Sequence, residues 1–257
     1  MSITTPVIEQ IHRHASIRKY KADPIDGSLI EAIVAAGQRA ATSSNLQTYA
    51  VVAVQALAKR VELARLCGNQ AHIVEAPIFL AWCADLSKLD RACQLRQLPH
   101  HHANVENFLM AAVDVALAAQ NAVLAAESLG LGACYIGGIR NQPRAVIKLL
   151  GLPRLLFPIT GLTLGWPESA AAPRPRLPQP AILHWEGYRG DQQDAALHEY
   201  DQTMIATGSY ENRQVPVPGR PDEMEQYGWL EHSARRVAQP QRGELRAVLR
   251  EQGFDLQ

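Results

Sequence analysis

The sequence of 257 residues predicts an α+β protein. Residues 104–129 are rich in alanine and leucine, lack proline, and precede Gly130, which favours one long helix. Apolar runs at residues 49–54, 78–84 and 157–164 are typical of buried strands. No G-x-G-x-x-G motif follows a strand, and no G-x-x-x-x-G-K-[ST] or G-x-S-x-G motif occurs. A Rossmann dehydrogenase, a P-loop NTPase and an α/β-hydrolase are therefore disfavoured.

Composition narrows the class of protein further. Hydrophobic residues make up 47% of the chain and the formal net charge is zero, so a packed globule is expected and a nucleic-acid surface is not. We find no apolar run typical of a signal peptide or a membrane span. The four widely spaced cysteines, which we expect to be free thiols in a reducing cytoplasm, are Cys67, Cys83, Cys93 and Cys134.

The first third of the chain predicts two helices and a polar corner. Residues 5–20 indicate a short helix followed by His14, Ser16 and Arg18. Ser28 and Glu31 have the spacing of a capping box, and the helix that they begin is expected to run to about Ala41. In isolation the basic corner is more typical of an ordinary solvated surface.

Polar loops separate the next elements. The hydroxyl-rich residues 41–49 precede the first strand and could form a turn or a loop that faces a polar ligand. A helix is expected at about residues 57–66, followed by the second strand. Residues 86–103 are expected to be irregular, and they contain His100, His101 and His102. Because adjacent side chains diverge, a solvated loop is favoured there and no metal site is expected.

After the long helix, residues 131–139 predict a short strand interrupted by Gly137 and Gly138, where backbone could approach something flat. A helix at 142–150 and the last strand follow. Residues 167–180 hold five prolines and should form an extended arm. The arm carries Arg174 and Arg176, which suit a stiff linker or a shared anion site.

Beyond the arm, helices are expected near residues 191–205 and 241–252, with a polar loop between them. Several of these segments together resemble the nitroreductase superfamily, in particular its NADPH-dependent, oxygen-insensitive nitroreductase and flavin reductase branch. The stretches that carry the resemblance are HASIR (14–18), TSSNLQ (42–47), GNQ (68–70), AQNAVLAAESLGLG (119–132), YIGG (135–138), LGWP (164–167) and PRLP (175–178).

This resemblance implies a central mixed sheet flanked by helices, and a homodimer in which the long helix packs against its twin. It implies FMN at two interface clefts and an FMN-dependent NAD(P)H oxidoreductase of the nitroreductase, flavin reductase or quinone reductase type. Two electrons would pass by ping-pong hydride transfer from NADPH or NADH to nitroaromatic, quinone or flavin acceptors. Residues 1–187 would form the FMN-binding domain, and residues 188–257 a helical extension packed on it.

The resemblance also assigns site residues. The positions that match the family's FMN contacts are His14, Ala15, Ser16, Arg18, Thr42, Ser44, Gln47, Gln70, Tyr135, Ile136, Gly137, Gly138, Arg174 and Arg176. No side chain need act as a catalytic nucleophile, and Arg18 would give electrostatic support to the reduced ring. Arg213 is the expected contact to the 2′-phosphate of NADPH.

More specific roles follow from each match. The N-terminal corner would contact the phosphate, the ribityl chain and the pyrimidine edge, and the arm arginines would clamp the phosphate. Gln70 would hydrogen-bond the isoalloxazine ring, and the backbone of residues 135–138 would approach it. The 42–47 loop would serve the FMN that the other subunit mainly holds.

The sequence departs from the family pattern at two positions. Ala15 replaces a usual arginine, and loss of one charge-assisted hydrogen bond would cost about 1.5–3 kcal/mol of FMN binding. Arg174 stands where lysine is common, which keeps the charge. Alternative functions are a flavin-binding or sensing module without turnover, reductive dehalogenation or flavin fragmentation, and a metal-binding role for His100–His102.

Overall fold

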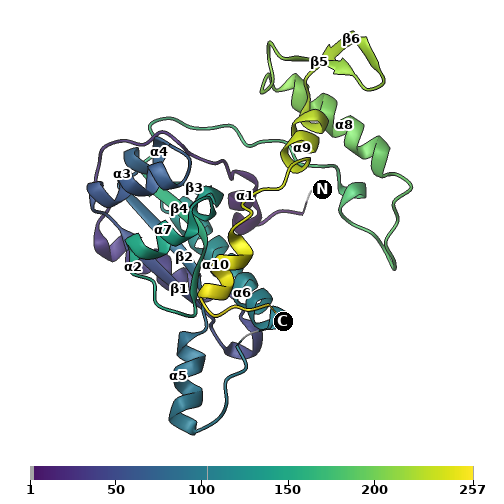
Figure 1. The fold of residues 1–257 in the computed structure, drawn as a ribbon. Coiled ribbons are helices and arrows are strands. Elements are labelled where there is room, and N and C mark those ends of the chain that lie inside the picture. Colours follow the sequence, from purple (N-terminus) through teal and green to yellow (C-terminus); the bar gives the residue numbers. More distant parts are fainter. Residues whose placement is uncertain (1–2, 103, 257) are drawn as a thin grey trace. The chain divides into compact units, whose positions relative to one another are not determined.

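The computed structural model describes residues 3–102 and 104–256, which form two compact units. The first unit comprises residues 1–173 and 242–257, and the second comprises residues 174–241. Figure 1 traces the elements of both units along the chain. The domain division expected after Gly187 stays a prediction.

A four-stranded antiparallel sheet forms the centre of the first unit. Its strands, in the spatial order β1-β2-β4-β3, are β1 (Tyr49–Val54), β2 (Ile78–Asp85), β3 (Gly132–Ile136) and β4 (Leu156–Gly165). All three pairings between these strands are antiparallel, and a parallel contact is made by the isolated bridge between Ser16 and Ala133. The expected α+β class is confirmed.

Helices cover both faces of this sheet. The helices of the first unit are α1 (Pro6–His12), α2 (Gly27–Gly37), α3 (Leu57–Leu66), α4 (His72–Glu75), α5 (Ser87–Arg96), α6 (Val105–Ser128), α7 (Pro143–Leu150) and α10 (Leu245–Glu251). Alternate residues of β2 face opposite ways: Leu80 and Trp82 join the core beneath α2 and α6, whereas Phe79 and Ala81 join the core beneath α3 and α7. Strand β2 is therefore buried on both faces, as its continuous apolar run predicted.

Helix α6 begins at the predicted position because the Asn104 side chain accepts a hydrogen bond from the Asn107 backbone N–H, at 2.8 Å. By length and hydropathy alone α6 could cross a membrane. Its residues Val115, Ala118 and Ala122 are fully buried in the core beneath the sheet, however. We therefore interpret α6 as a core helix.

Several local predictions were wrong. Helix α2 is capped by Asp26, whose carboxylate accepts the Ser28 N–H at 2.8 Å, and not by the predicted capping box. It ends at Gly37, short of Ala41. Gly37 packs closely on α6, since a Cβ there would meet the Ala118 carbonyl oxygen at 2.9 Å. Residues expected to be irregular form α5, which ends at Gln97 in the left-handed conformation.

The second unit contains more regular structure than the sequence predicted. It contains α8 (Gln193–Ala206), the antiparallel hairpin of β5 (Gln214–Val217) and β6 (Arg220–Gln226), and α9 (Trp229–Val237). Helix α8 was expected, but the hairpin and α9 fall in the predicted loop. Strand β6 reads RPDEMEQ and is fully exposed, so no apolar alternation marked it in the sequence.

Candidate functional site

The N-terminal corner lies beside strand β3. The Ile17 N–H donates to the Ala133 carbonyl oxygen at 2.9 Å, next to the bridge made by Ser16. His14 pairs through Nδ1 with Oε1 of Glu127 on α6, at 2.5 Å, and the Glu127 side chain is only 9% exposed. The corner is therefore fixed to both β3 and α6.

The glycine turn after β3 packs against the loop that holds Gln70. The Gln70 side chain donates through Nε2 to the Cys67 carbonyl oxygen at 2.7 Å. A Cβ atom on Gly138 would clash with that carbonyl and lie 2.6 Å from Gln70 Nε2. At Gly137 the nearest atom to such a Cβ would be Arg140 Nη2, at 3.7 Å. Gly138 thus permits close packing, whereas a Cβ at Gly137 would make only ordinary van der Waals contacts.

The charge of Arg18 changes the pKa values of two residues near this turn. Burial, and then the Arg18 guanidinium, lower the pKa of His72, the first residue of α4. Burial raises the pKa of Cys134 on β3, and Arg18 opposes that rise. The charge of Arg18 therefore acts on α4 and on the end of β3. Nε2 of His72 is buried there with no hydrogen-bond partner among the described residues.

Tyr135 and Ile136 differ in their exposure. Ile136 is fully buried and anchors the turn, while Tyr135 is 37% exposed and its hydroxyl donates to Gln120 of α6 at 3.4 Å. Burial and the charge of Glu127 raise the pKa of Tyr135.

Ala15, in the N-terminal corner beside β3, lines a cavity of about 370 Å³. Arg13 and Glu127 also line it, and Oε2 of Glu127 is buried without a partner in the part of the chain that the structure describes. Ala15 thus lines a cavity that is also bordered by a guanidinium and a carboxylate.

The hydroxyl-rich loop of residues 41–49, called the hydroxyl loop below, is anchored by Asp114 of α6. This carboxylate is 1% exposed and accepts the Ser43 N–H and the Thr48 N–H, each at 3.0 Å, and the Thr48 hydroxyl at 2.7 Å. Thr42 precedes the short 3₁₀ turn formed by residues 43–45. Sequence reasoning did not assign Asp114 to the site region, although a carboxylate within an apolar helix face is a signal for such an anchor.

Backbone strain is concentrated in this loop. Ser44, Asn45 and Gln47 have φ values of 47°, 58° and 54°, in the left-handed region that non-glycine residues seldom adopt. Such residues cost about 1–3 kcal/mol each and cluster at functional sites. Gln47 donates through Nε2 to the Asn45 backbone and side-chain oxygens at 3.4 Å.

The remaining predicted residues belong to the second unit. Arg174 and Arg176 are exposed, and Arg176 donates through Nη1 to the Arg174 carbonyl oxygen at 2.9 Å. The Arg213 guanidinium lies 5.7 Å from the centre of the Tyr227 ring. The assigned roles of these three arginines stay predictions.

The fold and these contacts define an α+β protein in which a glycine turn after β3 packs against the loop that holds Gln70. The solved structure of NfrA2 from B. megaterium matches with a TM-score of 0.90 and 34% identity, covering 99% of this chain and 100% of that one. The Nitroreductase family model matches residues 11–166, and the model of the Nitroreductase family, C-terminal domain, matches residues 174–257. The chain belongs to the nitroreductase family.

Two curated relatives cover nearly the whole chain. The FMN reductase [NAD(P)H] of Bacillus subtilis (strain 168) is 34% identical over 254 residues, which are 98% of each chain. The oxygen-insensitive NADPH nitroreductase of Salmonella typhimurium is 34% identical over 254 residues, which are 97% of this chain and 98% of that relative. The branch that the sequence motifs suggested is thereby confirmed.

Proposed function

We propose that this protein is an FMN-dependent NAD(P)H oxidoreductase that reduces nitroaromatic, quinone or flavin acceptors. The match of two family models along the chain, with relatives named for FMN and NADPH, carries this proposal. When bound, the flavin would supply hydride-transfer chemistry, which no protein side chain provides. The protein would contribute binding, orientation and charge.

The residues present fit FMN. Gly137 has no side chain to keep a flat ring away from its backbone, and Gln70 lies beside the neighbouring Gly138 as an amide able to meet a heterocycle edge. Arg18 supplies a permanent positive charge for a ring that gains negative charge on reduction. His14 and Ser16 would contact the phosphate and ribityl chain, and Arg174 and Arg176 would clamp the phosphate.

We also propose a homodimer. Helix α6 exposes Val105, Leu109, Val113 and Leu117 at four-residue intervals, each at least 43% exposed. An exposed apolar stripe of this kind indicates an interaction surface. A second copy packed there would bring its strained 42–47 loop toward the first copy's cofactor. The compartment would be the cytoplasm, where buried thiols stay reduced. The electron donor would be NADPH, and Arg213 would contact its 2′-phosphate.

A spectrum of the purified protein tests this function. We expect a yellow protein that releases FMN on heating and whose visible flavin absorption bleaches when NADPH is added without oxygen. A flavin that binds but is not reduced would instead support the binding-module alternative. A colourless protein that fails to take up added FMN would refute the proposal.

A further inference from the structure

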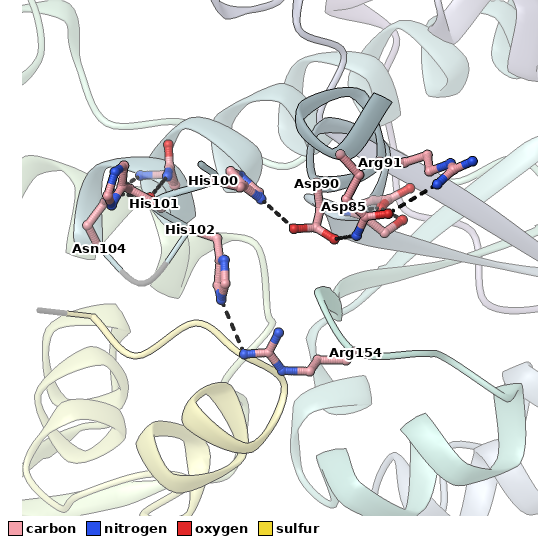
Figure 2. Close-up of polar contacts among 11 residues, drawn as sticks. Asp85, Asp90, Arg91, His100, His101, His102, Asn104 and Arg154 are labelled. Carbon is pink, nitrogen blue, oxygen red and sulfur yellow. Dashed lines mark hydrogen bonds and ion pairs between the residues drawn. The ribbon is translucent and has the colours of Figure 1, made fainter. Parts of the chain in front are cut away.

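Three side chains outside the proposed flavin site converge at the end of α5. They are Asp90 on α5 and His100 and His102 in the segment that follows (Figure 2). One ligand atom of each lies within 4.8 Å of the other two. His100 Nδ1 is 3.2 Å from Oδ1 of Asp90. The three adjacent histidines do not converge as a set, but His100 and His102 are two residues apart and a carboxylate completes the group.

The backbone between Asp90 and α6 is fixed in a conformation that brings these three side chains together. Gln97, with a φ of 56°, ends α5 and allows the chain to turn back toward Asp90. The His101 carbonyl oxygen accepts hydrogen bonds from the side-chain amides of Asn104, at 2.8 Å, and Asn107, at 2.7 Å. These bonds tie the histidine segment to the start of α6, and the His101 side chain is not part of the cluster.

Neighbouring groups orient the Asp90 carboxylate. Its second oxygen accepts from Nε2 of Gln94 at 2.7 Å, and the Gln94 oxygen accepts from Nη1 of Arg91 at 3.2 Å. This leaves Oδ1 of Asp90 directed at His100. Outer hydrogen bonds that hold a carboxylate in one orientation are characteristic of metal ligands.

The ring of His102 contributes one nitrogen to the cluster. Its Nδ1 is buried and has no hydrogen-bond partner among the described residues. A buried polar atom without a partner calls for an explanation, and a metal ion that replaces the ring proton there would supply one.

We propose that Asp90, His100 and His102 bind a divalent transition-metal cation of the Zn²⁺ class, with solvent completing the coordination. Imidazole and carboxylate donors suit this class. At bond lengths of about 2.0–2.2 Å, tetrahedral donor atoms lie about 3.3 Å apart. Asp90 and His100 already have that separation, and the third donor must approach by at most about 1.5 Å. The cation would fasten the histidine segment to α5.

Arg154 competes with this cation. Its Nη2 lies 3.2 Å from His102 Nε2, so its N–H donates to that nitrogen and leaves the proton of the ring on Nδ1. Whichever nitrogen of His102 binds the metal, this contact must loosen, and the guanidinium also repels the cation. Arg154 is exposed and can move away.

The test is Zn²⁺ titration by calorimetry of the full-length protein after removal of metal with a chelator, with Co²⁺ absorption as a second readout. We expect one Zn²⁺ per chain and a low-coordinate Co²⁺ spectrum. Asp90→Asn, His100→Ala and His102→Ala should each weaken binding at least about 10-fold, since even outer-shell changes cost that much. His101→Ala is the matched control and should bind normally, and Arg154→Ala should bind at least as tightly.

Absence of Zn²⁺ binding to the wild-type protein would overturn the proposal. So would binding that survives in all three ligand variants, which would place the metal on other histidines. Weaker binding in Arg154→Ala would contradict the predicted competition. Circular dichroism of each variant separates loss of the site from loss of folding. None of these readouts depends on the flavin, so this proposal and the proposed function can fail separately.

Discussion

At the residue scale, Gly137 and Gly138 differ in the room that surrounds them. Gly138 is enclosed by the Cys67 carbonyl and the Gln70 amide, whereas the nearest non-adjacent atom to a Cβ at Gly137 would be Arg140 Nη2, at 3.7 Å. One glycine is therefore required by packing. The other could accept a methyl group without a clash.

Substitution of each glycine separates these roles. We expect Gly137→Ala to fold like wild type but to bind FMN more weakly, because the new methyl group projects toward the ring. Gly138→Ala should instead destabilise the fold by about 1–3 kcal/mol, because overpacking forces the backbone to shift. Urea unfolding and FMN titration measure the two effects. Wild-type FMN affinity in Gly137→Ala would remove this glycine from the proposed site.

At the scale of elements, the contact between α6 and the hydroxyl loop holds a strained conformation in place. Asp114 accepts three hydrogen bonds from the residues at the two ends of the loop, and three residues between them have positive φ. One buried carboxylate thus holds both ends of the strained loop.

Asp114→Asn tests this dependence. The amide matches the carboxylate in shape but places an N–H₂ group against donors, so we expect a loss of about 1.5–3 kcal/mol in the free energy of unfolding. Glu106→Gln makes the same chemical change at an exposed position of α6 and should stay within about 0.5 kcal/mol. Urea unfolding at fixed protein and FMN concentrations gives both values. Equal stability of the two variants would show that Asp114 does not hold the loop.

At the scale of the whole molecule, the exposed stripe of α6 leads to a prediction about assembly. Leu117→Glu places a charge in the proposed dimer interface, where its desolvation is unfavourable, and should shift the protein toward monomer. Leu57→Glu makes the same change at an exposed leucine of α3, outside the stripe, and should leave a dimer. Size-exclusion chromatography with light scattering reads the masses. A wild-type protein that is monomeric at micromolar concentration would contradict the proposed homodimer.

Much of the first unit could be predicted from sequence because its signals are local. Strand β1 and helix α3 have the predicted bounds, and α6 begins and ends within one residue of its predicted range. The signals that predict them are apolar runs, helix propensity and a terminal glycine, and each acts within a few residues. The family and its branch could also be predicted, because seven short motifs occur in order along the chain.

The sequence by itself therefore determined the class of fold, the position of the long core helix and the family. Only the tertiary structure decided that Asp114 anchors the hydroxyl loop, that Gly138 is enclosed while Gly137 is not, and that Asp90 meets His100 and His102. The physical reason is distance along the chain. A buried carboxylate or a histidine acquires its role from a partner supplied by another element, and neighbouring residues carry no record of that partner.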